Sequence, residues 1–213
     1  MKNFHRKKNT QLVWACILPW LFIVLCGSCN SCGARPGENG MEQRPAKWAT
    51  PMSATGLPNL HRMTDSLYRG AQPEAAGFVE LERMGIRTVV NLRHYGNDKD
   101  EFEKSRITSG SMTLVSIPMD AGNVSRENII AFLRVATDDN ALPLFFHCKH
   151  GADRTGTMAA AYRMVVQGWT TDEAIAEMKN GGYNYHAMWK NLPELLQKLD
   201  VAKIQEILSL PTE

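Results

Sequence analysis

A cysteine and an arginine stand six positions apart in "HCKHGADRTG", where an apolar segment ending at His147 gives way to a helix-like one. A loop of this length between a strand and a helix can turn its backbone N–H groups inward, beside the partial positive charge of the helix N-terminus. Gly151 permits the tight turn, and Arg154 adds a planar fork that matches two oxygens of a phosphate. The same positive field favours the thiolate form of Cys148. The pattern therefore predicts a cysteine nucleophile aimed at a bound phosphate ester.

Attack by a thiolate on a phosphate ester gives a phosphocysteine intermediate and requires a proton for the departing oxygen. A carboxylic acid from another part of the chain must supply that proton. Our candidate is Asp120, because it follows a predicted strand of a parallel sheet and so emerges at the same sheet edge as Cys148. The same carboxylate would then serve as the base when water attacks the intermediate. Four other acids on candidate loops stay open as alternatives: Asp65, Asp98, Asp100 and Glu101.

Several neighbours of the cysteine have roles that the sequence leaves open. Thr155 could donate a hydrogen bond to the thiolate, and His147 either orients the loop or is an ordinary structural residue. The negative charge of Asp153 is better explained by anchoring of the loop than by acid catalysis. Lys149 and His150 either add positive charge to the pocket or form a solvated rim. The residues expected to line the bound phosphate are Lys149, His150, Gly151, Ala152, Asp153 and Arg154.

The distribution of cysteines separates Cys148 from the others. The remaining cysteines all lie within the first 32 residues: Cys16, Cys26, Cys29 and Cys32. The rest of the chain can therefore form no internal disulfide and no cysteine-based zinc cluster. A lone thiol is either inert in a core or reactive in a site, and the surrounding loop favours the reactive interpretation.

Residues 1–32 differ in character from the rest of the chain. The basic start "MKNFHRKK" precedes an uncharged apolar block from Leu12 to Cys26, and small and polar residues follow. This pattern is typical of a signal peptide or of a membrane or lipid anchor. Cys29, preceded by Gly27 and Ser28, is the candidate for lipidation. We therefore expect the protein to be exported or membrane-anchored, on the periplasmic side of a bacterial cell envelope.

The remaining chain divides into a linker and one domain. Residues 33–60 are rich in proline and glycine and poor in apolar residues, which is typical of a linker, and residues 61–213 form the expected catalytic domain. The whole chain of 213 residues is 44% hydrophobic and 22% charged, which suits a single globular core. Its net charge of +2 is small, so we expect no nucleic-acid partner.

Strand-like and helix-like segments alternate along the domain, which predicts an α/β fold with a mainly parallel sheet covered by helices on both faces. Ser125 can cap one helix, and Thr170 with Glu173 forms a capping box for another. The loop "GGYNYHAMW", residues 181–189, could shape a substrate entrance. The expected strands cover residues 66–70, 86–93, 113–119 and 141–147, and the expected helices cover 73–85, 98–107, a segment after Ser125, a segment from about Arg154, 170–179 and 188–208.

The stretch "HCKHGADRTG" is similar to the HC-x5-R-[ST] signature of the cysteine-dependent protein tyrosine and dual-specificity phosphatases, and "YRGAQP" and "TVVNLR" resemble segments that precede it in the compact dual-specificity group. The resemblance implies a phosphate-binding loop between the last core strand and a helix. It also implies that Cys148 is the nucleophile, Arg154 the phosphate binder and Asp120 the general acid. No metal or other cofactor is expected to take part.

The resemblance implies a phosphoprotein phosphatase that acts on phosphotyrosine and also on phosphoserine or phosphothreonine. A phosphoinositide or inositol polyphosphate phosphatase is the main alternative, because Lys149 and His150 resemble residues in the loops of such enzymes. A catalytically silent phosphate-binding module is the second alternative, but it would have no use for Cys148 and Asp120 together. In a rhodanese-type sulfur transferase, Thr155 and a distant acid would have no clear purpose.

Overall fold

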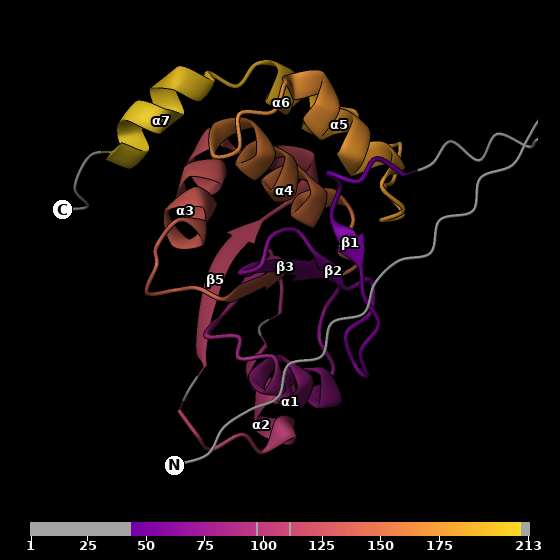
Figure 1. The fold of residues 1–213 in the computed structure, drawn as a ribbon, viewed down its shortest axis with the longest axis vertical. Coiled ribbons are helices and arrows are strands. Elements are labelled where there is room, and N and C mark those ends of the chain that lie inside the picture. Colours follow the sequence, from indigo (N-terminus) through magenta and orange to yellow (C-terminus); the bar gives the residue numbers. More distant parts are fainter. Residues whose placement is uncertain (1–43, 97, 111, 210–213) are drawn as a thin grey trace, which may run out of the picture. The chain divides into compact units, whose positions relative to one another are not determined.

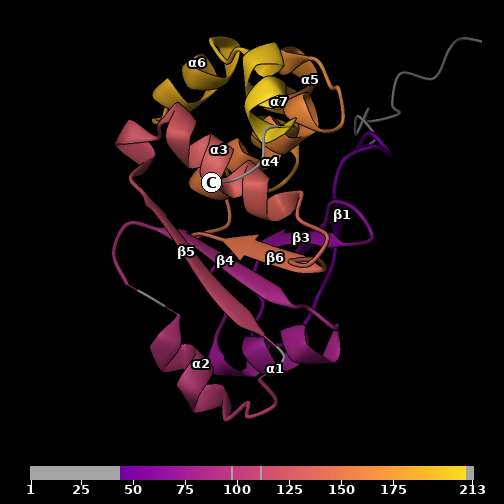
Figure 2. The same ribbon diagram turned by 90° about the vertical axis from the view of Figure 1, so that its left-hand side faces the viewer.

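The computed structural model describes residues 44–96, 98–110 and 112–209. Its strands are β1 (Thr50–Pro51), β2 (His61–Arg62), β3 (Leu67–Gly70), β4 (Thr88–Arg93), β5 (Thr113–Met119) and β6 (Leu144–His147). Its helices are α1 (Ala75–Arg83), α2 (Lys99–Ser105), the 3-10 turn η1 (Ala121–Asn123), α3 (Arg126–Ala136), α4 (Asp153–Val165), α5 (Thr171–Asn180), α6 (Asn191–Gln197) and α7 (Val201–Ser209). The sheet lies between two helical layers, with α1 and α2 on one face and the later helices on the other (Figures 1 and 2).

The sheet has the strand order β1-β2-β3-β6-β4-β5, and β3, β6, β4 and β5 run parallel to one another. Its register aligns His147 with Gly70 on one side and with Asn91 on the other. Arg93 at the end of β4 lies opposite Met119 at the end of β5. The carboxyl ends of the four parallel strands therefore meet at one edge, and the predicted mainly parallel sheet is confirmed.

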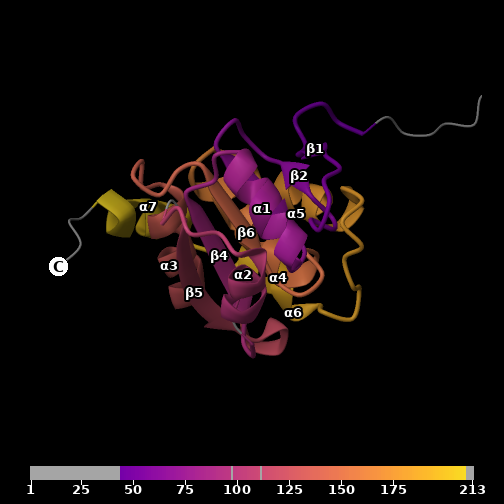
Figure 3. The same ribbon diagram turned by 90° about the horizontal axis from the view of Figure 1, so that it is seen from below.

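Strands β4 and β6 are buried on both faces of the sheet, which explains their nearly continuous apolar sequences. Val89 and Phe145 pack into a core on the side of α1 and α2, the side nearest the viewer in Figure 3. Val90 and Phe146 pack into the larger core formed with α3 to α7. All four side chains have 0% exposure, so the sheet edge that carries Cys148 rests on a closely packed base.

The local signals at helix ends are confirmed. Ser125 and Asn128 form a capping box at the start of α3, and Thr170 and Glu173 form another at the start of α5. Gly85 follows α1 with a φ of +74°, a conformation that favours glycine. Each of these helix ends depends on the residue at the end itself, through a capping side chain or the backbone freedom of glycine. The sequence around each end was therefore enough to predict it.

The predicted helix over residues 188–208 is wrong, because the chain forms two helices there, α6 and α7. Asp200 stands between them, and its side-chain Oδ1 accepts a hydrogen bond from the N–H of Lys203 at 2.9 Å. Apolar residues continue on both sides of the break. Asp200 is thus the start signal of a new helix that the apolar pattern conceals.

The predicted linker reaches too far into the chain, because residues 44–60 pack into the domain. Strand β1 pairs antiparallel with β2, and Ala49, Leu57 and Leu60 are all at most 3% exposed. The folded unit therefore starts before residue 61. The predictions for residues 1–32, here the leader, include lipidation of Cys29 and lie outside the described residues, as does the part of the linker before residue 44. Among the helices that the structure describes, none is both long enough and apolar enough to span a bilayer.

Candidate active site

The loop from Cys148 to Arg154, here the 148–154 loop, joins β6 to α4 and has its carbonyl groups engaged one after another. The contacts are His147 Nδ1 with Cys148 O (3.2 Å), Gln72 N with Lys149 O (3.3 Å), Asn59 Nδ2 with His150 O (2.9 Å), Arg69 Nη2 with Gly151 O (2.8 Å) and Gly156 N with Ala152 O (2.7 Å). In the described part of the chain, no group accepts a hydrogen bond from the N–H groups of residues 149–152. These N–H groups remain available, so the loop can bind an anion.

Gly151 fits where no other residue could. Its φ is +70°, and a Cβ at this position would stand 2.5 Å from the carbonyl carbon of Gly70 on β3. Gly70 is confined in turn, because a Cβ there would lie 2.8 Å from the ring of Phe145. Two glycines from distant segments therefore let the 148–154 loop rest directly on the end of β3.

Cys148 and Arg154 stand at the two ends of this loop. Cys148 is 2% exposed and follows the last residue of β6. The half-buried Arg154 points a guanidinium nitrogen, Nη1, at the carbonyl oxygen of Met119 across 3.4 Å. It forms no ion pair with an acid in the described segments, and its Nε is buried without a partner. The positive charge of Arg154 is therefore available to an anion in the loop.

Asp120 lies at the same sheet edge, directly after the Met119 carbonyl that Arg154 contacts. Its side chain is exposed, and Oδ1 accepts a hydrogen bond from the N–H of Gly122 at 2.7 Å. Asn191 at the start of α6 holds this turn by donating to the carbonyl of Ala121 at 2.8 Å. The carboxylate is thus positioned by its own turn, as expected for Asp120 from its place after a strand.

The alternative acids are less well placed. Asp65 precedes β3 and so lies towards the opposite edge of the sheet, with its side chain fully exposed. Asp100 and Glu101 lie on α2, and Glu101 forms an ion pair with Lys104 at 2.6 Å. Asp98 is 4% exposed and belongs to the support of the loop.

Asp98 and His147 form a buried pair beneath the cysteine. His147 has no exposed surface, and its Nε2 lies 2.8 Å from Asp98 Oδ2, while Nδ1 faces the carbonyl of Cys148. Burial acts to raise the pKa of Asp98, but hydrogen bonds from His147 and Gln72 and the charge of Arg93 lower it below its ordinary value. The anionic carboxylate holds the histidine ring, and this favours the orienting role for His147 over an unconnected structural one.

Asp153 anchors a second loop instead of facing the pocket freely. Its Oδ1 accepts from the backbone N–H of His186 at 2.9 Å, and its Oδ2 lies 2.8 Å from His186 Nδ1. This contact ties residues 181–189, here the 181–189 loop, to the 148–154 loop. The ring of His186 also lies 5.5 Å from that of His150, so the 181–189 loop borders the site.

Thr155 and Lys149 differ in their surroundings. Thr155 is fully buried, and its hydroxyl has no hydrogen-bond partner among the described residues. The hydrogen bond to the cysteine that the sequence suggested is therefore not formed. Lys149 is exposed at the rim of the loop.

Arg69 is a supporting residue that our sequence reasoning missed. It is 1% exposed, donates to the Gly151 carbonyl at 2.8 Å, and stacks with its guanidinium carbon 3.7 Å from the centre of the Tyr183 ring. Burial lowers the pKa of Arg69, while Tyr183, Glu177 and Cys148 act in the opposite direction. An arginine within the short apolar strand "LYRG" was the available signal, because a buried cation needs a specific partner.

Replacing Arg69 by methionine should lower kcat/KM for an aryl phosphate and slow alkylation of Cys148 by iodoacetamide. The lost hydrogen bond to a charged group is worth about 1.5–3 kcal/mol, which corresponds to roughly a ten- to hundredfold loss of rate. Arg69→Lys should recover part of the kcat/KM and part of the alkylation rate of Cys148. Arg62→Met, at an exposed position on the neighbouring β2, is the matched control. Unchanged alkylation and turnover in Arg69→Met would remove Arg69 from this role.

Comparison with known proteins agrees with this geometry. Residues 49–190 match the family described as "DSP-PTPase phosphatase fused to NAD+ Kinase". Dual specificity protein phosphatase TpbA of Pseudomonas aeruginosa (strain UCBPP-PA14) is 37% identical over 126 residues, which cover 59% of this chain and 55% of TpbA. Inositol diphosphatase DSP5 of Arabidopsis thaliana is 25% identical over 125 residues, which cover 56% of this chain and 60% of DSP5. The chain thus spans little more than half the length of these curated relatives.

A solved structure extends the likeness to the fold. The crystal structure of P. aeruginosa TpbA in complex with pTyr matches with a TM-score of 0.68 and 28% sequence identity, covering 79% of this chain and 99% of that one. The family match includes β3, the turn at Asp120, the 148–154 loop and the 181–189 loop. On this ground the chain belongs to the family of DSP-PTPase phosphatases.

Proposed function

We propose that this protein is a cysteine-dependent phosphomonoester hydrolase that acts on phosphotyrosine in proteins, and on phosphoserine or phosphothreonine as well. The observation that carries the proposal is the 148–154 loop. The carbonyls of residues 148–152 accept hydrogen bonds, the N–H groups of residues 149–152 donate none within the described part of the chain, and Arg154 forms no ion pair there. The similarity to TpbA, which has been crystallised with pTyr, supports the choice of substrate.

In the first step the thiolate of Cys148 attacks the phosphorus of the bound ester. The S–P bond forms as the P–O bond to the leaving group breaks, and Asp120 gives its proton to the departing oxygen. The N–H groups of the loop and the fork of Arg154 hold the three other phosphate oxygens and stabilise their charge as it redistributes. A phosphocysteine and the free alcohol or phenol result.

In the second step water attacks the phosphocysteine. Asp120, now a carboxylate, accepts a proton from the water as the new P–O bond forms and the S–P bond breaks. Cys148 returns to the thiolate, and inorganic phosphate leaves the loop. Asp120 then carries the proton that the next cycle needs.

Replacing Asp120 by alanine should slow the reaction most for substrates with poor leaving groups. Loss of a general acid costs about 10²–10⁴-fold in rate, and the cost shrinks when the leaving oxygen needs no proton. Turnover of a phosphotyrosine peptide and of an activated aryl phosphate should be compared. Asp65→Ala, a change at an exposed acid near the opposite sheet edge, is the control. An equal loss for both substrates, or no loss, would contradict the assignment.

An inositol polyphosphate or phosphoinositide substrate is the second candidate. Two exposed basic side chains of the 148–154 loop, Lys149 and His150, could bind additional phosphates. DSP5, a more distant relative, is named an inositol diphosphatase. Phosphate release from phosphopeptides, phosphoinositides and inositol polyphosphates at equal concentration separates the candidates. A higher kcat/KM for phosphopeptides supports the first, and a strong preference for either inositol class favours the second.

We further propose that the leader brings the catalytic domain to the outer side of the cytoplasmic membrane. The support is the sequence of residues 1–32 alone, with its basic start, apolar block and Cys29 after small residues. Fractionation of bacterial cells that express the full chain tests this proposal. Recovery of the protein in the cytoplasm with its leader intact would contradict it.

A further inference from the structure

Three side chains that bind metals gather beside the 148–154 loop. One donor atom from each of His150, Asp153 and His186 lies within 4.8 Å of the other two. His150 and Asp153 come from the 148–154 loop, and His186 comes from the 181–189 loop, more than thirty residues later. Both histidines are exposed, whereas the side chain of Asp153 is 10% exposed. The cluster is therefore open to solvent on one side and rests on the fold on the other.

The donor types select a class of ion. Two imidazole nitrogens and one carboxylate oxygen suit Zn²⁺ and neighbouring divalent transition metals, whereas Mg²⁺ and Ca²⁺ prefer oxygen ligands alone. Three protein ligands leave a position for water or another oxygen donor. We propose that His150, Asp153 and His186 form a binding site for a divalent transition-metal ion of the Zn²⁺ type.

The ligands are held together before any ion arrives. The backbone of His150 is fixed by the hydrogen bond that its carbonyl accepts from Asn59 at 2.9 Å. The backbone of His186 is fixed by its N–H, which donates to Asp153 Oδ1 at 2.9 Å. These backbone contacts do not involve the imidazole rings. A metal ion can therefore bind to the rings without breaking the contacts. Such preorganisation lowers the entropy cost of binding.

The charge at the cluster also favours a cation. Asp153 contributes a carboxylate whose ion-pair partner in the described part of the chain is His186. A metal ion bound between the Asp153 carboxylate and the His186 imidazole would be attracted by the same negative charge. It would also gain His150 as a third ligand. The ion would join the 148–154 loop to the 181–189 loop, next to the anion site. The reaction proposed above needs no metal. The proposal of a metal site therefore does not depend on the proposed function, and either can fail without the other.

Cobalt(II) is the probe for the test, because its visible d–d absorption reports both binding and coordination geometry. The titration should use the full chain with the leader cysteines Cys16, Cys26, Cys29 and Cys32 replaced by serine, since thiolates there would bind the metal too. We expect saturation at one ion per chain, and displacement of the absorbing cobalt by Zn²⁺. His150→Ala and His186→Ala should each lower the affinity at least about tenfold, by the usual effect of removing a ligand or its support.

Two matched variants identify the site. Cys148→Ser tests whether the nearby thiolate is the ligand, and His94→Ala changes an exposed histidine outside the cluster. Both should bind cobalt as the parent does. If His186→Ala alters the unfolding curve, His186→Gln, which keeps a polar side chain, replaces it in the titration. Absence of saturable binding, loss of binding in Cys148→Ser, or full binding in both histidine variants would overturn the proposal.

Discussion

Cys148→Ser should reduce the turnover of an aryl phosphate by on the order of 10⁴-fold or more, the scale seen when an enzyme loses its nucleophile. A serine hydroxyl in the same position is not ionised at neutral pH, so the positive field of the loop and Arg154 cannot make it comparable to a thiolate. Release of inorganic phosphate at saturating substrate measures the effect. Vanadate should inhibit the unmodified chain, because it occupies the same anion site.

Substrate binding distinguishes loss of chemistry from loss of the fold. Cys148→Ser should still bind a phosphotyrosine peptide, since the loop N–H groups and Arg154 are unchanged. Arg154→Lys should weaken this binding, because a point charge cannot replace the planar fork. If Cys148→Ser and the unmodified chain hydrolyse the substrate at equal rates, the phosphocysteine mechanism is wrong.

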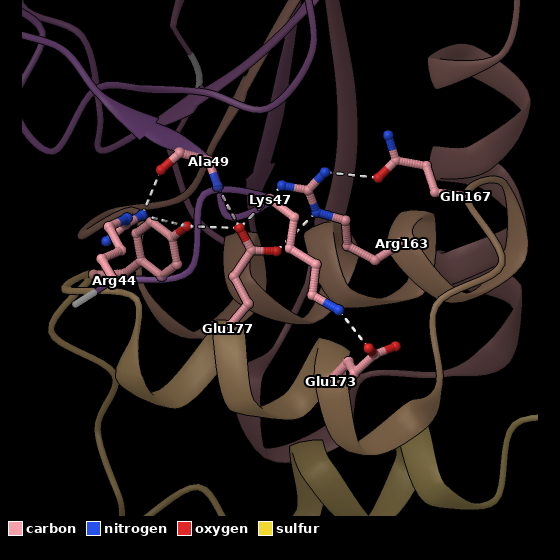
Figure 4. A network of polar contacts seen from close by, with 8 residues as sticks. Arg44, Lys47, Ala49, Arg163, Gln167, Glu173 and Glu177 are labelled. Atoms are coloured by element: carbon pink, nitrogen blue, oxygen red, sulfur yellow. Dashed lines mark hydrogen bonds and ion pairs between the residues drawn. The ribbon is translucent and has the colours of Figure 1, made fainter. Parts of the chain in front are cut away.

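The second large effect concerns stability and the buried carboxylate of Glu177 on α5. Figure 4 shows Glu177 at the centre of a polar network that joins α4, α5 and the segment before β1. The carboxylate accepts from Arg163 Nε at 2.7 Å and Nη2 at 3.0 Å, from the N–H of Ala49 at 2.6 Å and from the Tyr183 hydroxyl at 3.1 Å. Glu177 and Arg163 are each 2% exposed. Removal of the acid would leave a buried guanidinium without its counter-charge.

We expect Glu177→Ala to lower the free energy of unfolding by about 3–5 kcal/mol, the usual cost of breaking one half of a buried ion pair. Urea unfolding followed by circular dichroism measures it. The control is Asp172→Ala on the same helix, which removes an exposed carboxylate and should change the free energy of unfolding little. Equal effects of the two substitutions would show that Glu177 does not carry the network.

The pH dependence of stability gives an independent check. Burial acts to raise the pKa of Glu177, but the hydrogen bond and charge of Arg163 and the N–H of Ala49 outweigh it, so the folded-state pKa is lowered. The resulting stabilisation is present above the unfolded-state pKa and is lost as the pH falls through the folded-state value. Glu177→Gln should therefore lose less stability on acidification than the unmodified chain.

The same network explains why the segment before β1 belongs to the catalytic unit. Arg44 donates to the Tyr183 hydroxyl at 3.2 Å and also to the carbonyls of Ala49 and Gly181. The ring of Tyr183 in turn supports Arg69, which holds the carbonyl of Gly151. A fragment for activity measurements should therefore begin before Arg44.

The amino-acid sequence was enough to predict a phosphate-binding loop around Cys148 and most of the elements that position it. The spacing of Cys148, Gly151 and Arg154 is a local property, and the strand before and the helix after it follow from apolar runs and helix-end residues. Asp120 could be placed at the same edge because parallel strands all end there. These positions could be predicted because each depends on residues close in sequence or on a general rule of sheet topology.

Only the tertiary structure revealed what supports the loop. Asn59, Gln72 and Arg69 reach the carbonyls of the 148–154 loop from segments more than seventy residues away. The apolar strand around Arg69 indicates a buried cation but not its partner, and no local pattern indicates the contacts of Asn59 and Gln72. The break at Asp200 and the packing of residues 44–60 escaped for the same reason, since apolar periodicity does not report which hydrogen bonds a polar side chain makes. The residues that perform chemistry carry a local signature, whereas those that hold them are selected by burial, charge and close approach, which only the folded chain defines.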